Sequence, residues 1–372
     1  MMTGNIMDYL DWYGDFDFSV LPFNDVDNLI LAELSYASLD GIVKEPQLGR
    51  RLRTISVKDA ANELKESGRM EKSCKLEKNA GQLLLEMAKG KRFSDALLAG
   101  YVDKHDFKNQ EQFSALHIYL PDGTLFVSYS GTDDTILGWK EDLNMAYQMP
   151  VPSQEEAVEY LEKTVPHDGR MIRIGGHSKG GNLAIYAAVM CYDRLKQRII
   201  GIYNNDGPGF LESMLERKSY LEVKDRIKTI VPETSIVGML LEHGDSYEVV
   251  KSTGKGIMQH DGLSWQVYKN GFVKLDERSK ESLVIDKTIG TWVMGLSDNE
   301  RVAFVDTVYD MLTGAGINYL SELEQYKPAM LNSMVKEMFS MEPEKAKMVR
   351  RIIRALISEY GKNVVSGIRG GR

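Results

Sequence analysis

The sequence predicts an α/β protein, in which a mostly parallel sheet is flanked by helices and further helical regions lie at both ends of the chain. Between about residues 113 and 270, short apolar runs typical of strands alternate with helical patterns, as in a sheet built with crossover helices. Helical spacing predominates before and after this stretch. We therefore expect residues 1–112 to form a helical N-terminal or cap region, 113–270 the core, and 271–372 a helical C-terminal extension.

The N-terminal third carries the first helical patterns. Residues 25–36 place Val26, Leu29 and Leu34 at helical spacing, after a proline at position 22 that suits a helix entry. The stretch 57–101 is charged, has helical character and is interrupted by glycines. We expect these segments to cover the core as a flanking layer and not to join its sheet.

The predicted core begins with a β-hairpin, whose strands 115–120 and 124–130 flank a Pro-Asp-Gly turn. Ser153 and Glu156 form a capping box that predicts a helix ending near residue 164. Further strands are expected over residues 171–175, 198–204, 226–231 and 247–250, and a buried helix over 182–192.

Composition and charge exclude several classes of protein. The 372 residues are 43% hydrophobic and 27% charged, as in a globular protein with a sizeable core. The formal net charge of −8 argues against nucleic acid as the main partner. The first basic residue is Lys44, which does not fit a secretory signal. Cys74 and Cys191 lie far apart, and no Cys/His cluster has zinc spacing. We expect a cytoplasmic protein that needs no metal or other cofactor.

The most informative segment runs from Gly176 to Gly180 and has the pattern Gly-x-Ser-x-Gly, with a predicted strand before it and a helix after it. A serine at such a turn has its hydroxyl lifted out of the sheet, as in the nucleophile elbow of hydrolases. We therefore expect Ser178 to be a nucleophile and the amide of Lys179 to bind developing negative charge. The alternatives are an ordinary glycine-rich turn and a phosphate-binding loop, but the Gly-Lys-Ser/Thr order of a P-loop is absent.

A serine nucleophile needs a base, and in hydrolases with this elbow the chain order is serine, acid, histidine. Only His243 and His260 follow Ser178. His260 lies in a loop after the last clear strand, where the base belongs, so we favour it. His243 follows a segment that resembles a helix end, where an imidazole can act as a cap.

The acid is less sharply defined by the sequence. Asp206 follows the strand after the nucleophile helix and precedes Gly-Pro, which places it well to face a loop histidine. A local role in capping its own loop is the alternative. Glu233, at the end of the next strand, is the competing candidate. Asp245 and Asp261 are weaker candidates.

A second donor to the oxyanion is expected in the loop after an earlier strand. Thr132 follows Gly131 at the end of the predicted strand 124–130 and can offer both an amide and a hydroxyl. The alternative is that Thr132 and Asp133 only cap a short helix that contains Trp139 and Asp142.

With these residues identified, the sequence resembles the fungal-type (class 3) lipases of the α/β-hydrolase fold, and more closely a bacterial lipase-like family of unknown function. The resemblance covers roughly residues 1–270. It rests on the segments 22–28, 129–142, 176–181, 206–210, 235–238 and 259–261. It implies an α/β-hydrolase fold, a nucleophile at Ser178 and an oxyanion contribution from Thr132. Fungal-type lipases carry their acid after the strand that corresponds to 227–231, where this chain has Ser235 and no aspartate.

The C-terminal residues 341–372 hold eight Lys or Arg against three Glu, and their apolar residues form one helical stripe. Such a helix can lie on an anionic membrane surface, although a stripe of this kind more often packs on a core. Methionines at positions 330, 334, 338 and 341 are ambiguous in a similar way, because flexible methionines suit either an apolar binding surface or ordinary packing.

Together these features predict a serine hydrolase of carboxylic esters, whose substrate is a small-molecule ester or lipid and whose catalytic residues are Ser178, His260 and Asp206. Thioesters and amides would use the same groups. The alternative is a non-catalytic, hydrolase-like module that binds an acyl ligand, a protein or a membrane surface. The sequence does not specify an oligomeric state.

Overall fold

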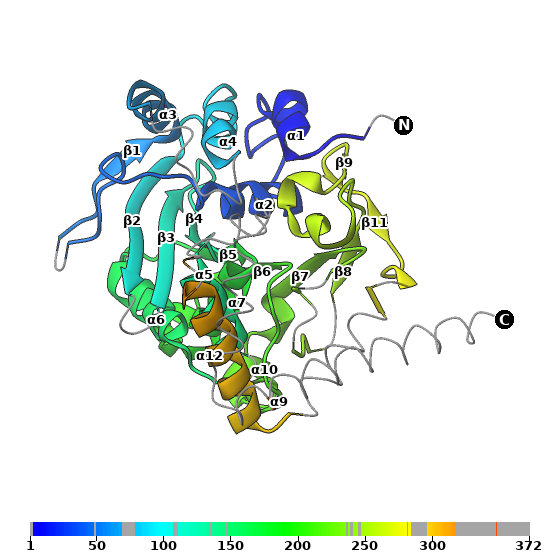
Figure 1. Cartoon of the computed structure of the whole chain (residues 1–372). Coiled ribbons are helices and arrows are strands. Elements are labelled where there is room, and N and C mark those ends of the chain that lie inside the picture. Colours follow the sequence, from blue (N-terminus) through cyan, green and yellow to red (C-terminus); the bar gives the residue numbers. More distant parts are fainter. Residues whose placement is uncertain are drawn as a thin grey trace.

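The computed structural model describes residues 3–47, 50–68, 79–106, 111–133, 135–145, 148–235, 237–238, 241–244, 247–280, 282–283, 296–314, 316 and 347. Within these residues, a nine-stranded sheet forms the centre of the structure, in the order β1-β2-β3-β4-β5-β6-β7-β8-β11 (Figure 1). These strands are β1 (Thr54–Ser56), β2 (Leu97–Asp106), β3 (Glu111–Tyr119), β4 (Leu125–Tyr129), β5 (Ile172–His177), β6 (Ile199–Asn205), β7 (Ile227–Pro232), β8 (Glu248–Val250) and β11 (Lys274–Leu275). Strands β9 (Val267–Tyr268) and β10 (Gly271–Phe272) pair separately.

The five strands from β4 to β8 are parallel, and the strands outside them are antiparallel. The predicted hairpin is present, because β3 and β4 pair with Ala115 opposite Tyr129. In a parallel sheet the carboxyl ends of the strands meet at one edge, and this edge is where loops of such folds gather functional side chains. The α/β class and the parallel central sheet are thus confirmed.

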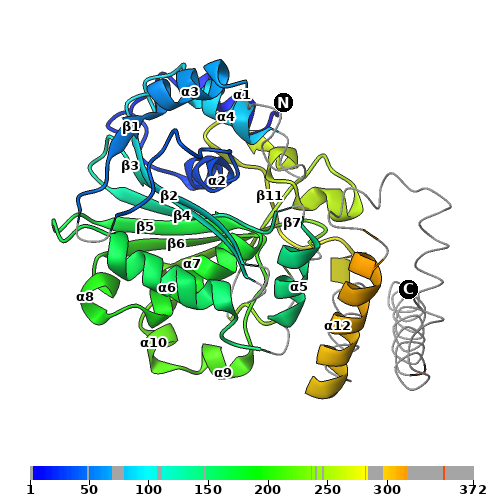
Figure 2. The ribbon, with the colours of Figure 1, turned by 60° about the vertical axis from the view of Figure 1, so that its left-hand side comes forward.

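Helices cover both faces of the sheet (Figure 2). One layer contains α1 (Ile6–Tyr13), α2 (Asp25–Leu34), α3 (Val57–Glu66) and α4 (Ala80–Met87). The opposite layer contains α6 (Pro152–Thr164), α7 (Lys179–Met190), α8 (Asp193–Lys196), α9 (Glu212–Leu215) and α10 (Lys218–Leu221). Two further helices, α5 (Ile136–Asn144) and α12 (Asp298–Gly314), lie side by side next to the sheet.

The alternation of side chains along the central strands explains the two layers. Ile118 and Phe126 belong to a buried cluster with α1 to α4, whereas Ala115, Val127 and Tyr129 belong to a second cluster with α6 and α7. Because successive residues of a strand point to opposite faces, a strand that is apolar throughout needs cover on both sides. The sheet is therefore buried between two helical layers.

The N-terminal layer is fixed by a buried ion pair. Arg92, which precedes β2, places its Nε 2.7 Å from Asp27 Oδ1 and its Nη2 2.5 Å from Asp27 Oδ2, and both side chains are fully buried. The Tyr9 hydroxyl adds a 3.1 Å hydrogen bond to the same carboxylate. Three segments of the N-terminal region, around residues 9, 27 and 92, are thereby tied together.

The structure corrects two predictions. Residues 1–112 are not helical throughout, since they contribute β1 and β2 to the sheet. The regular alternation of β2 is broken by a bulge at Gly100, whose φ of +63° is unfavourable for other residues, and so the strand does not show a clear period of two. Helix α6 begins one residue before Ser153: its N-cap is Val151, whose amide donates to the Gln154 side chain.

The basic helix predicted within residues 341–372 and the methionines before it lie outside the described residues, apart from Lys347. Among the residues that the structure describes, no helix is long and apolar enough to cross a bilayer.

Candidate active site

Ser178 lies at the turn between β5 and α7, at the carboxyl edge of the sheet. Its backbone has φ +56° and ψ −134°, a conformation that a non-glycine residue adopts only where its surroundings impose it. The surroundings are tight, because a Cβ on Gly180 would lie 2.1 Å from the Tyr129 carbonyl oxygen. The Ser178 amide donates to the Asn205 carbonyl at 2.9 Å, which ties the turn to the end of β6. This is the geometry of a nucleophile elbow, and the fold is that of the α/β-hydrolases.

His260 and Asp206 form a hydrogen-bonded pair beside this turn. The distance from His260 Nδ1 to Asp206 Oδ2 is 2.7 Å. Asp206 is the residue after β6, it is fully buried, and its φ is +52°. Because a carboxylate accepts, Nδ1 carries the proton, and in the neutral form of the ring Nε2 then has the lone pair. The neutral His260 ring therefore has the tautomer that a general base requires.

Two further donors hold the Asp206 carboxylate. The Ser235 hydroxyl donates to Asp206 Oδ1 at 2.5 Å, and the Gly238 amide also donates to this side chain. Burial raises the pKa of the Asp206 carboxyl, while the His260 ring and these donors oppose that rise. Ser235 occupies the loop after β7, the same loop in which fungal-type lipases carry their acid.

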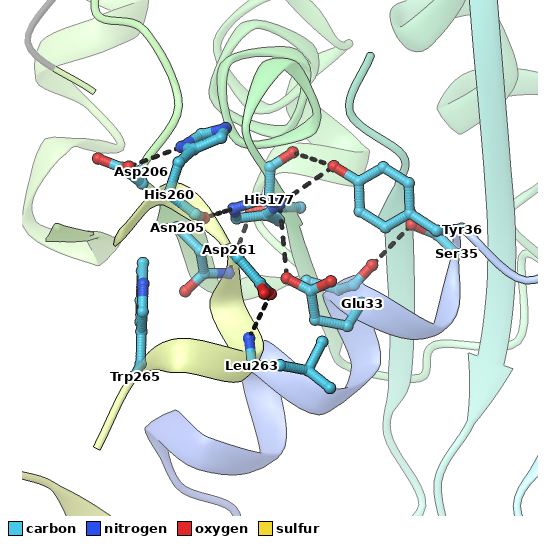
Figure 3. Close-up of polar contacts among 12 residues, drawn as sticks. Glu33, Ser35, Tyr36, His177, Asn205, Asp206, His260, Asp261, Leu263 and Trp265 are labelled. Carbon is cyan, nitrogen blue, oxygen red and sulfur yellow. Dashed lines mark hydrogen bonds and ion pairs between the residues drawn. The ribbon is translucent and has the colours of Figure 1, made fainter. Parts of the chain in front are cut away.

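The backbone around His260 is anchored as well as its ring (Figure 3). His177 Nε2, next to Ser178, donates to the His260 carbonyl oxygen at 2.7 Å, and the Tyr36 hydroxyl lies 3.1 Å from His177 Nδ1. Burial, with a smaller effect of the nearby His260, lowers the pKa of His177 well below its usual value, so this ring stays neutral. Trp265 Nε1 donates to the Gln259 carbonyl at 2.9 Å. The loop that carries His260 is thus fixed relative to the elbow.

The two predicted oxyanion residues are both linked to helix α5. The Thr132 hydroxyl donates to Asp142 Oδ2 at 2.5 Å. The side chain of Lys179 is fully buried, and its Nζ lies 3.0 Å from Glu141 Oε2. Lys179 is also the first residue of α7, where an amide has no intrahelical acceptor and remains available to a ligand. Thr132 does not cap α5, because the N-cap is Thr135.

The other candidates from the sequence have different surroundings. His243 bonds through Nε2 to the Gly238 carbonyl, and burial lowers its pKa to about 4. Glu233 uses its backbone, accepting from the Ser279 amide and donating to Val250. Asp261 caps the short helix η4 (Gly262–Ser264), and Asp245 lies outside the described residues. Of the base and acid candidates that the structure describes, only His260 and Asp206 are hydrogen-bonded to each other.

Sequence reasoning did not identify several residues that support the site. Ser235, His177 and Glu141 make contacts with residues 29, 83 and 38 positions away, respectively. For Ser235 the sequence did offer a signal, because the resemblance to fungal-type lipases aligns it with the segment in which those lipases carry their acid. Within the described parts of the chain, no group of three or more His, Cys, Asp or Glu side chains is arranged to hold a metal ion.

Comparisons with known proteins found similar solved structures and one family model. The solved structures similar to the chain include M37 lipase, at 16% identity and a TM-score of 0.37, where the match covers 59% of this chain and 70% of that one. They also include a fungal lipase in complex with an inhibitor, at 13% identity and a TM-score of 0.32, with 55% of this chain and 83% of that one covered. No curated protein matches the chain. The model of the Mbeg1-like family matches residues 87–310, more than half of the sequence. The chain belongs to the Mbeg1-like family.

Proposed function

We propose that this protein is a serine hydrolase that cleaves carboxylic esters of a small molecule or lipid. The observation that carries the proposal is the His260–Asp206 pair, with its 2.7 Å hydrogen bond, next to a serine held at positive φ between β5 and α7. A serine at such an elbow is a weak nucleophile until an oriented base accepts its proton. His260 has an orienting carboxylate, and its backbone is bonded to the residue before Ser178.

In the first half of the reaction, Ser178 Oγ forms a bond to the ester carbonyl carbon as His260 Nε2 takes the hydroxyl proton. The carbonyl oxygen becomes an oxyanion, which the amides near Thr132 and Lys179 stabilise. The tetrahedral intermediate then expels the alcohol, which receives the proton from His260. In the second half, a water molecule deprotonated by His260 attacks the acyl-enzyme, and Ser178 leaves with the proton.

The roles of the three supporting carboxylates differ. Asp206 orients the imidazole and stabilises its charged form during each half-reaction. Asp142 and Glu141 contact Thr132 and Lys179 and do not touch the reacting atoms. Glu233 has no part in this mechanism.

Hydrolysis of short-chain nitrophenyl esters by the full chain tests the proposal. We expect turnover that is lost in Ser178→Ala and in His260→Gln, whereas His243→Asn keeps it. A panel of esters, thioesters and amides with increasing acyl length then defines the substrate class. A protein that binds acyl ligands without Ser178-dependent turnover would be the non-catalytic module instead.

We also propose that the protein acts in the cytoplasm and that its C-terminal residues 341–372 contact anionic membranes. Both proposals rest on the sequence: cysteine use for the compartment, and an excess of basic residues for the membrane. Co-sedimentation of the full chain with anionic vesicles and with neutral vesicles tests the second. Equal binding to the two kinds of vesicle would contradict it.

A further inference from the structure

Three consecutive residues of helix α5 contact three different parts of the molecule. Asp142 accepts from the Thr132 hydroxyl at 2.5 Å, and Glu141 lies 3.0 Å from Lys179 Nζ. Lys140 places its Nζ 2.8 Å from Asp306 Oδ1 on helix α12. Helix α5 thus connects both proposed oxyanion residues with the C-terminal part of the chain.

The contacts toward the site are buried and specific. Glu141 and Lys179 are both fully buried, and Lys179 Nζ also lies 2.7 Å from the Gln112 carbonyl. Glu141 Oε1 in addition accepts from the Ser153 amide at 2.9 Å. A buried charge with several partners has few alternative positions, since moving it leaves donors or acceptors unpaired. A shift of α5 would therefore move the residues on which the oxyanion donors depend.

The contacts toward α12 are also specific. The Lys140 side chain is only 7% exposed, and its ammonium lies 4.3 Å from the centroid of the Tyr309 ring in addition to its bond with Asp306. Asp306 and Tyr309 are three residues apart and therefore lie on one face of α12. Figure 2 shows α12 running along α5 on the side away from the sheet. An ion pair combined with a cation–π contact fixes one long side chain from two directions.

We propose that α12 is a clasp for the oxyanion site: Asp306 and Tyr309 are positioning residues that, through Lys140, hold α5 and with it Thr132 and Lys179. This inference rests on the proposed hydrolase function and assigns a role to the C-terminal extension. The clasp does not touch substrate. It acts on the stabilisation of the oxyanion, which is greater in the transition state than in the ground state.

Two disruptive variants and two matched controls test the clasp in the full chain. Asp306→Asn removes the charge, and Tyr309→Leu removes the ring. Tyr309→Phe keeps the ring, and Asp310→Asn changes an exposed carboxylate on the same helix. The readouts are kcat and KM for a nitrophenyl ester, inhibition by a trifluoromethyl ketone that mimics the tetrahedral intermediate, and hydrogen–deuterium exchange of residues 136–144.

For the disruptive variants we expect kcat to fall by roughly two- to tenfold with KM unchanged, and the ketone to inhibit less strongly by a similar factor. Exchange in α5 should become faster. The control variants should match the wild type. The clasp is wrong if Asp306→Asn and Tyr309→Leu behave like Asp310→Asn, or if they alter KM alone.

Failure of the hydrolase proposal is distinguishable from failure of the clasp. If the wild type neither hydrolyses esters nor reacts at Ser178, the hydrolase proposal fails. Hydrogen–deuterium exchange of α5 and a double-mutant cycle then test whether α12 holds α5. In that cycle, Lys140→Met and Asp306→Asn should have non-additive effects on unfolding by urea. Additive effects with unchanged exchange in α5 would overturn the clasp itself.

Discussion

Replacement of Asp206 by asparagine gives a sharp prediction, because the structure determines how the new amide would be oriented. Oδ1 of Asp206 accepts from the Ser235 hydroxyl and is the carboxylate oxygen nearest to Gly238, whose amide also donates to this side chain, while Oδ2 accepts from His260. In Asp206→Asn the amide oxygen should stay with the two donors, so that the NH2 group faces His260 Nδ1. The ring must then accept at Nδ1 and carry its proton on Nε2, where it can no longer take the proton of Ser178.

The magnitude follows from that change of tautomer. In serine hydrolases the corresponding substitution lowers kcat by about 10⁴-fold, which is about 5.5 kcal/mol of transition-state stabilisation. Because the Asp206 side chain is fully buried, the substitution removes a charge from a position without access to solvent. We therefore expect the free energy of unfolding to be maintained while activity is lost.

The assay compares kcat of Asp206→Asn with that of Glu233→Gln, the matched change at the other carboxylate considered from the sequence. Urea unfolding of both variants shows whether each is folded. Glu233→Gln should keep nearly the wild-type kcat, because its carboxylate is not bonded to His260. A loss in Glu233→Gln that equals or exceeds the loss in Asp206→Asn would show that Asp206 is not the carboxylate that orients His260.

Three further predictions concern stability, each measured by urea unfolding. Burial raises the pKa of Asp142 to about 6, so the folded state favours the protonated form and the free energy of unfolding falls as pH rises from about 4 to 6. The Asp142→Asn variant should lack that fall and be about 1–3 kcal/mol more stable than the wild type at pH 7, and an unchanged pH profile would contradict this. Arg92→Met leaves Asp27 buried without its partner and should lower the free energy of unfolding by about 3–5 kcal/mol. Adding Asp27→Leu to this variant should restore part of the loss. A loss below about 1 kcal/mol would show that the ion pair is dispensable. Gly180→Ala places a Cβ 2.1 Å from the Tyr129 carbonyl and should cost at least about 1–3 kcal/mol, whereas Gly271→Ala, with no atom within 4 Å, should be nearly neutral.

The central elements of the fold could be predicted from the sequence because their signals are local. Strand β5, the elbow and α7 follow one another within a few residues, and the hairpin β3–β4 encloses a Pro-Asp-Gly turn. Strand β2 was not predicted, because the bulge at Gly100 interrupts its alternation and its second half is charged. Its place in the sheet depends on pairing with β3, a tertiary contact that local spacing does not reveal.

The same distinction applies to the site. Ser178 is marked by a local motif, and chain order narrowed the base to His260 or His243. The choice of Asp206 over Glu233 depends on which loop bends toward His260, and so the sequence left both open. The supporting contacts of Ser235 with Asp206, and of Lys140 with Asp306, join segments 29 and 166 residues apart. Only the folded chain brings them together.

The proposed mechanism depends on Ser178 being a nucleophile that His260 activates. Labelling with a fluorophosphonate, which reacts with activated serines, followed by peptide mass spectrometry, measures this activation. We expect one adduct, located on Ser178, that is absent in Ser178→Ala and forms far more slowly in His260→Gln. No adduct on Ser178 in the folded wild type, or labelling at the same rate in His260→Gln, would contradict it.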